Sequence, residues 1–114
     1  MNRSDFKTIE ELPIDIEGSR ETKGFHYHQV YRKNGWYVYK VTRTYDNGYT
    51  KELFEVFKEK VDNKLIVING KFTKSQDDGR IRYPCDEEFG LFAWTLPTFD
   101  GCLRKIAEKV PNLM

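Results

Sequence analysis

The sequence predicts a single α+β domain in which one amphipathic C-terminal helix covers one face of an antiparallel β-meander of about five or six strands. Aromatic and β-branched runs separated by Asn-Gly turns fill residues 24–83, which indicates strands joined by tight hairpins. Apolar residues then recur with a helical period within residues 97–110. The length of 114 residues suits one domain, 1–114, with one core.

The composition, with 39% hydrophobic and 15% aromatic residues, is that of a globular rather than a disordered protein. The 19 Lys and Arg residues nearly balance the 18 Asp and Glu residues, which argues against a histone-like basic protein and against an acidic tail. The N-terminus has no apolar run of the length that a signal peptide or a membrane span requires. We therefore expect a cytoplasmic protein without a membrane partner, in which Cys85 and Cys102 stay reduced.

Residues 1–23 are less regular than the rest of the chain. Ser4 is a candidate N-cap of a short helix that would end before Pro13. The apolar side of that helix would hold Phe6, Ile9 and Leu12. An alternating apolar and acidic run follows at residues 14–17 and predicts a short edge strand.

The strongest hairpin signal is Asn34-Gly35, which lies between the strand-like runs 25–33 and 36–45. Asn-Gly at this place predicts a type I′ turn, because that turn needs positive φ at both central residues. A second turn, Asn47-Gly48, joins the second run to residues 49–60.

Charge favours one register for the second hairpin. If Asn47-Gly48 alone forms the turn, Arg43 lies opposite Glu52, whereas a three-residue turn opposes Arg43 to Lys51. Like charges directly opposite each other destabilise a sheet, so the two-residue turn is predicted.

Counting outward from both turns divides the predicted sheet into two faces, with Val30 opposite Tyr39. The first face is expected to lie under the helix and holds His28, Val30, Tyr39, Val41, Phe54 and Val56. The second face is aromatic with some polar groups and holds Phe25, Tyr27, Gln29, Tyr31, Trp36, Val38, Lys40, Thr42, Leu53, Glu55 and Phe57. One helix covers one face, so the second needs another cover: the N-terminal segment, residues 65–68, a second copy of the chain or a partner protein.

The apolar run at residues 65–68 ends at Asn69-Gly70, and Asp78-Gly79 indicates a further turn within a loop at residues 75–79. The C-terminal helix is predicted to begin after a Thr98 N-cap and to end at Pro111. Its apolar stripe contains Phe99, Cys102, Leu103, Ile106, Ala107 and Val110.

His26 and His28 lie two residues apart on a predicted strand, so both side chains point to one face, as in many metal sites. They are candidate metal ligands. No third ligand is evident, and the predicted register sets Arg43 beside His26, where it would repel a cation. We therefore expect a pair of hydrogen-bonded histidines and no metal.

Other catalytic patterns are weak. Cys85 precedes the acidic run 86–88, whose charge opposes the thiolate that a nucleophile needs, and Asp86 is expected to cap a single turn that Gly90 ends. Consecutive carboxylates do not converge on one point, and the chain has no glycine-rich phosphate-binding pattern. The sequence thus predicts a protein that is not an enzyme and has no cofactor.

The aromatic second face predicts a binding function. We expect a module that binds a partner protein, or a second copy of itself, through Tyr27, Tyr31, Trp36, Lys40 and Phe57. The alternative is single-stranded nucleic-acid binding, because aromatic rings for base stacking lie near several cations. Those cations are Arg20, Lys23, Arg32, Lys33, Lys40 and Arg43, against Glu21 alone within residues 19–45.

The segment from Arg82-Tyr83-Pro84 through Phe89-Gly90-Leu91-Phe92-Ala93-Trp94 carries a resemblance to a known group of proteins. Together with the Thr98 helix and the preceding run 54–58, it is similar to small uncharacterised proteins of gut-type bacteria and their phages. The resemblance covers the C-terminal half and implies a compact accessory protein without an established activity.

Overall fold

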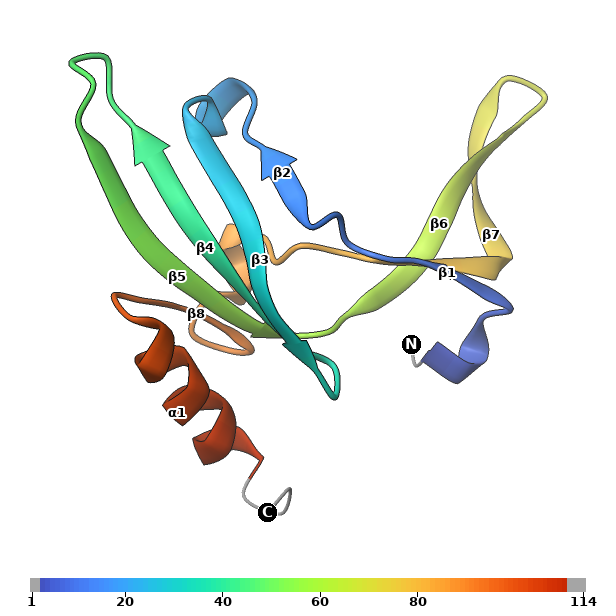
Figure 1. Cartoon of the computed structure of the whole chain (residues 1–114). Helices are drawn as coiled ribbons and strands as arrows, with labels where there is room; N and C mark the ends of the chain where they lie inside the picture. The colour runs from blue at the N-terminus through green and yellow to red at the C-terminus, as the bar shows by residue number, and fades with distance from the viewer. Residues whose placement is uncertain (1–2, 111–114) are drawn as a thin grey trace. The chain divides into compact units, whose positions relative to one another are not determined.

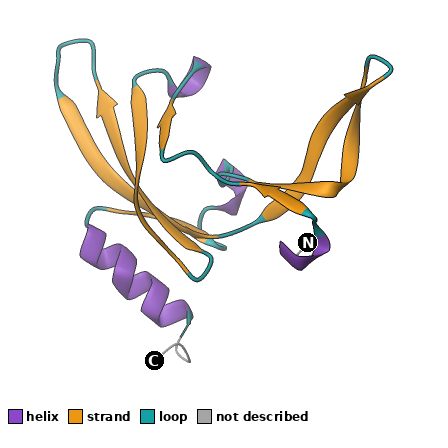
Figure 2. Ribbon diagram, turned by 45° about the vertical axis from the view of Figure 1, so that its right-hand side comes forward, coloured by secondary structure: helices purple, strands orange, loops and turns teal. Residues whose placement is uncertain are grey.

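The structure is a computed structural model that describes residues 3–110 as two compact units. The larger unit comprises Pro13–Lys58 and the residues from Pro84 onward, and the smaller unit comprises the residues up to Leu12 and Glu59–Tyr83. Antiparallel strands dominate, and the C-terminal helix packs on a sheet (Figures 1 and 2), so the predicted α+β class is confirmed.

The larger unit contains a five-stranded antiparallel sheet with the strand order β2-β3-β4-β5-β8. Strand β2 lies at one edge, which confirms the edge strand predicted at residues 14–17. The chain leaves this sheet after β5 and returns to it at β8, so the sheet is not one uninterrupted meander. The strands are β2 (Asp15–Glu17), β3 (Phe25–Lys33), β4 (Trp36–Thr44), β5 (Thr50–Lys58) and β8 (Ala93–Leu96).

A β-bulge at Val30 changes the predicted register between β3 and β4. Asn34 and Gly35 both have positive φ, so the predicted turn is confirmed. Beyond the bulge, however, Gln29 rather than Val30 pairs with Tyr39. Compared with the predicted pairing, the extra residue turns every earlier side chain of β3 over relative to β4.

The second hairpin uses the three-residue turn that charge had argued against. Residues 46–48 form the turn, and Gly48 has a φ of 85°, as expected for a type I turn that ends in a left-handed residue. Arg43 therefore lies opposite Lys51, and the predicted register is wrong. The like charges are tolerated because the Arg43 guanidinium lies 5.1 Å from the ring centroid of Phe25, where a cation is attracted.

Helix α1 (Phe99–Lys109) confirms the predicted C-terminal helix. It packs on the sheet face that holds Trp36, Val38 and Val56, which we call the helix face, through Cys102 and Ile106. The sequence predicted that it would cover the face of Tyr39 instead, and this is wrong. The three-residue turn brings Val56 beside Val38 and builds an apolar strip under the helix.

The other side of this sheet, the opposite face, has its own aromatic core. Tyr37, Tyr39 and Phe57 are fully buried there, and the Tyr39 and Phe57 rings stack with centroids 5.8 Å apart. The Tyr39 hydroxyl donates a hydrogen bond to the Pro13 carbonyl at 2.6 Å and accepts one from Gln29 at 2.9 Å. These polar contacts let a tyrosine occupy a fully buried position.

Replacing the helix cap tests the assignment of the helix start. The Thr98 hydroxyl accepts a hydrogen bond from the Gly101 amide at 3.0 Å, so Thr98→Ala is expected to lower the free energy of unfolding by about 1 kcal/mol. Thr98→Ser keeps the acceptor and should stay within about 0.5 kcal/mol of wild type. Urea unfolding measures both, and equal losses for the two variants would contradict the capping role.

The smaller unit is a three-stranded sheet with the order β1-β7-β6. Its strands are β1 (Thr8–Glu10), β6 (Val61–Ile68) and β7 (Lys71–Ile81), and β1 runs parallel to β7. The predicted N-terminal helix is wrong, because a 3₁₀ turn at Arg3–Asp5 leads directly into β1, which pairs with β7. The side chain of Ser4 and all of Pro111, predicted to cap and to end helices, lie outside the described residues.

Strand β7 is irregular where the sequence predicted a loop and a turn. Asn63 pairs with Gly79 and Leu65 pairs with Lys74, so residues 75–78 form a bulge within the strand. The Asn63 side chain donates to the Ser75 carbonyl at 2.7 Å and holds the bulge in place. Asp78-Gly79 is therefore strand rather than turn.

Within residues 3–110, no helix has the length and the apolar composition needed to cross a membrane.

Candidate functional site

The five side chains predicted to form one contact surface are divided between the two faces of the five-stranded sheet. Tyr31, Trp36 and Lys40 belong to the helix face, whereas Tyr27 and Phe57 belong to the opposite face. The bulge and the longer turn cause the division, because each shifts the pairing by one residue.

Burial separates these side chains further. Trp36 is 3% exposed and Phe57 is fully buried, so both are core residues. Tyr31 contacts the ring of Phe99 and lines a hollow of about 230 Å³ with Leu103 on α1. The five residues therefore do not offer one continuous exposed surface to a partner.

An exposed apolar surface lies instead at the end of the β6–β7 hairpin, at residues 64–74, which we call the hairpin tip. Phe72 is 79% exposed, Val67 62% and Leu65 59%. Val67 pairs with Phe72, and Leu65 lies two residues from Val67, so these three side chains share one face. The sequence signal was the apolar run before Asn69-Gly70, which was interpreted as a strand or as a cover for the sheet.

The hairpin tip is basic and has free strand edges. Lys71 and Lys74 lie in it, Lys64 at its base pairs with Glu10 at 2.9 Å, and the sequence has no acidic residue between Lys64 and Lys74. Strand β1 pairs with β7 only from Asp78 onward, so among the described residues the tip is two-stranded. Unpaired strand edges beside exposed apolar groups can accept another chain.

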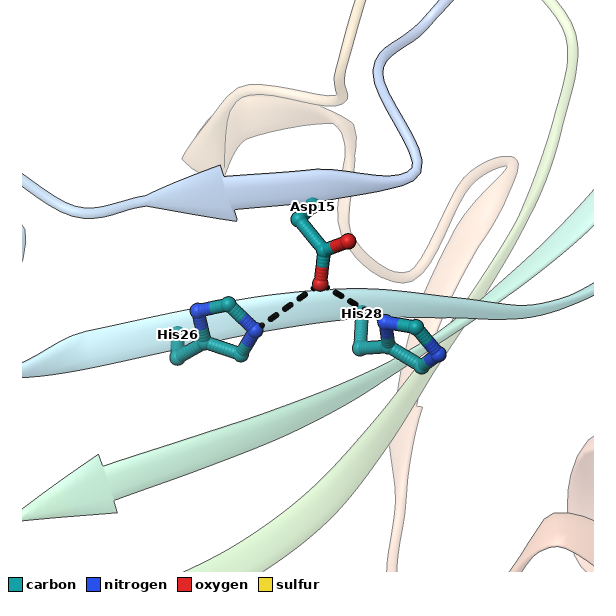
Figure 3. A group of neighbouring side chains, drawn as sticks. All are labelled: Asp15, His26 and His28. Carbon is teal, nitrogen blue, oxygen red and sulfur yellow. Dashed lines mark hydrogen bonds and ion pairs between the residues drawn. The ribbon is translucent and has the colours of Figure 1, made fainter.

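A second cluster of functional side chains lies on the helix face, at the edge strand β2. Antiparallel pairing sets Asp15 opposite His28 and Glu17 opposite His26. Figure 3 shows Asp15 between the two imidazole rings: its Oδ1 lies 3.1 Å from His26 Nε2 and 2.7 Å from His28 Nδ1. Glu17 contacts the other ring nitrogen of His26, Nδ1. Asp15 could not be recognised as the third group from the sequence, because its place opposite His28 depends on the pairing of β2 with β3.

The carboxylates stabilise the charged form of His26. Hydrogen bonding to Glu17 and then to Asp15 raises the pKa of His26 above its ordinary value of 6.5. Hydrogen bonding to His28 and then to His26 lowers the pKa of Asp15 below its ordinary value of 3.8. The charged cluster is therefore favoured between the lowered pKa of Asp15 and the raised pKa of His26.

This electrostatic coupling predicts that the stability of the metal-free chain depends on pH. Folding raises the pKa of His26, so protonated His26 stabilises the folded chain. This stabilisation is fully present below the pKa of His26 in the unfolded chain and is lost as pH rises through its pKa in the folded chain. Glu17→Gln removes the carboxylate whose hydrogen bond raises this pKa most, so the pKa of His26 should fall in an NMR titration with chelator present. Glu21→Gln, on an exposed 3₁₀ helix, should leave it unchanged. A His26 pKa at or below 6.5 in the wild type would contradict this prediction.

The two cysteines occupy different environments. Cys102 lies on the buried side of α1, and burial raises the pKa of its thiol to about 11, which suits a core residue and not a nucleophile. Cys85 is exposed and precedes the 3₁₀ helix Asp86–Glu88, so the predicted single turn is confirmed. The turn is closed by Glu88, whose side chain accepts a hydrogen bond from the Cys85 amide at 2.9 Å, rather than by Asp86.

Comparison of the chain with protein-family models, curated proteins and solved structures found no match. The resemblance to uncharacterised bacterial and phage proteins therefore stays a prediction, and function must be argued from the geometry alone.

Proposed function

We propose that this chain is a cytoplasmic interaction module that binds a partner protein through the hairpin tip, residues 64–74. The observation that carries the proposal is the exposure of Leu65, Val67 and Phe72 on one face of a two-stranded hairpin. Contiguous exposed apolar side chains on a small protein typically mark a binding surface. The two free thiols agree with a reducing compartment.

The stability of the tip supports a partner. A two-stranded hairpin is marginally stable in water unless an apolar face is covered. Ile68 is also half exposed and belongs, by the alternation, to the other face of the tip. A partner that covers the tip therefore removes apolar surface from water and stabilises the hairpin at the same time.

The charge of the tip favours a different protein over a second copy. Two tips packed through the face of Leu65, Val67 and Phe72 would also bury the Lys74 of each copy, which pairs with Leu65, and like charges across an interface oppose association. An acidic surface with an apolar centre complements the tip in both respects. A hollow of about 360 Å³ beside Leu65, lined also by Val61 and Asp62, can receive a side chain of that partner.

Titration of the wild-type chain and its variants with the purified partner tests this function. The wild-type chain is used to isolate a co-purifying protein from cells that encode it, and the purified pair is then titrated. Leu65→Ser/Phe72→Ser should weaken the affinity by about 30-fold or more, as for loss of central anchors. Leu91→Ser, which alters a leucine of the larger unit that is 74% exposed, should change it by less than about threefold. Added salt should weaken the wild-type complex.

Three outcomes would contradict the proposal. The double variant could bind the purified partner as tightly as wild type. Sedimentation could show a dimer that the double variant abolishes, which would make a second copy the occupant. A single-stranded oligonucleotide could bind the tip in place of a protein, which would favour the nucleic-acid alternative.

A further inference from the structure

We propose that Asp15, His26 and His28 bind a divalent first-row transition metal ion that clamps edge strand β2 to β3. This site is independent of the hairpin tip and of the proposed interaction function. It combines two imidazoles and one carboxylate, a donor set found for zinc and for other first-row divalent ions.

Strand pairing brings the three donors together without any loop. His26 and His28 alternate on β3 and so project from one face, and Asp15 lies directly opposite His28 on β2. The candidate donor atoms of the three residues all lie within 4.8 Å of one another. Donors supplied by paired strands are held by backbone hydrogen bonds before any ligand arrives, which reduces the cost of ordering the site.

The separations are close to those that an ion needs. Metal bonds of about 2.0–2.2 Å place neighbouring donor atoms of a tetrahedral site about 3.3–3.6 Å apart. Asp15 Oδ1 lies 3.1 Å from His26 Nε2 and 2.7 Å from His28 Nδ1. The three donor atoms lie within 4.8 Å of one another, so side-chain rotations that equalise their separations would let one ion contact all three.

Glu17 acts as a positioning residue for His26. It contacts Nδ1, and when Nδ1–H donates to this carboxylate the lone pair of Nε2 is directed toward Asp15. A carboxylate behind a ligating histidine fixes the tautomer and the ring orientation and makes the imidazole a better donor. Asp15 and Glu17 thus have different functions although they lie on the same strand.

In the observed register Arg43 does not lie opposite His26, so the predicted repulsion between Arg43 and a bound cation does not arise. Arg43 pairs with Phe25, and its guanidinium lies over that ring, whereas His26 pairs with Thr42. The cation that does face the site is Lys40, opposite His28, and its Nζ lies 3.5 Å from the carboxylate of Glu52. The positive charge of Lys40 is therefore partly neutralised.

The exposure of the three side chains and the nature of their donor atoms indicate which ions the site can bind. The side chains of His26, His28 and Asp15 are 39%, 49% and 57% exposed, so an ion can reach them and can keep water on its remaining positions. Imidazole ligands favour zinc, cobalt, nickel and copper over calcium and magnesium, which prefer oxygen. The clamp would hold β2, which has only three residues, at the edge of the sheet.

Zinc and cobalt titrations of the chelator-treated chain test the site. Calorimetry with zinc should give one ion per chain. In wild-type NMR spectra, cobalt should broaden the ring signals of His26 and His28, the only histidines in the sequence, and zinc should shift them. Asp15→Asn and His28→Gln should lose stoichiometric binding, and Glu17→Gln should weaken it about 10- to 100-fold. Glu21→Gln should bind zinc like the wild type.

The same measurements can overturn the proposal. Absence of zinc binding by the folded wild type would do so, and the NMR experiment requires no variant to fold. Binding that persists in His28→Gln but disappears in Cys85→Ser, with a thiolate-to-cobalt absorption band, would assign the ion to the exposed cysteine instead. Equal affinity in Asp15→Asn and wild type would exclude Asp15 as a ligand.

Discussion

Phe57→Ala is expected to lower the free energy of unfolding by about 3–5 kcal/mol, because it removes a large, fully buried aromatic side chain. The Phe57 ring stacks on Tyr39 and packs against Tyr37, with ring centroids 5.8 and 5.4 Å apart. The surrounding strands cannot collapse fully into the space, so a cavity adds to the lost burial. Urea unfolding followed by tryptophan fluorescence measures the change.

Tyr49→Ala provides the control for this prediction. Tyr49 is also aromatic but is 62% exposed, so its removal should change the free energy of unfolding by less than about 0.5 kcal/mol. A similarly small loss for Phe57→Ala would mean that the ring lies at the surface. That result would restore Phe57 as a candidate contact residue, as the sequence predicted.

Gly79→Ala is expected to destabilise the smaller unit by about 1–3 kcal/mol through overpacking. A Cβ at this position would lie 2.7 Å from the ring of Phe6 and 2.9 Å from a methyl group of Val61. Both neighbours are buried, so neither can move away at low cost. Hydrogen exchange of the β6 and β7 amides reports on this unit, and their protection should fall.

A double-mutant cycle separates the clash from other effects of the methyl group. Phe6→Ala removes the closest neighbour, so adding Gly79→Ala to it should cost clearly less than adding it to wild type. Strictly additive losses would show that Phe6 and residue 79 do not interact.

The sequence predicted most elements of the fold because each had a local signal. Asn34-Gly35 defined a hairpin, and Thr98 with its apolar stripe defined α1. The register could not be predicted, because it depends on a bulge at Val30 and on a three-residue turn. Each differs from the prediction by one residue, and one residue is enough to exchange the two faces of a strand.

The residues of the candidate sites could likewise be predicted only where the signal was local in the sequence. His26 and His28 were found from their spacing, whereas Asp15 could be recognised only when β2 was aligned with β3. The prediction that Trp36 and Phe57 are exposed relied on all the aromatic side chains sharing one uncovered face. In the structure Trp36 and Phe57 are buried on different faces, and an exposed apolar group of Leu65, Val67 and Phe72 lies at the hairpin tip.

The bulge at Val30 makes this position unusual with respect to insertions and deletions. Tyr31 and Gln29 already pair with neighbouring residues of β4, so an in-frame loss of codon 30 leaves every partner of β3 unchanged. Loss of a single codon from 26 to 28, with the bulge kept, would instead displace the earlier residues of β3 by one place and turn their side chains over. A codon-by-codon deletion scan of this strand should therefore recover more folded protein at position 30 than at positions 26–28.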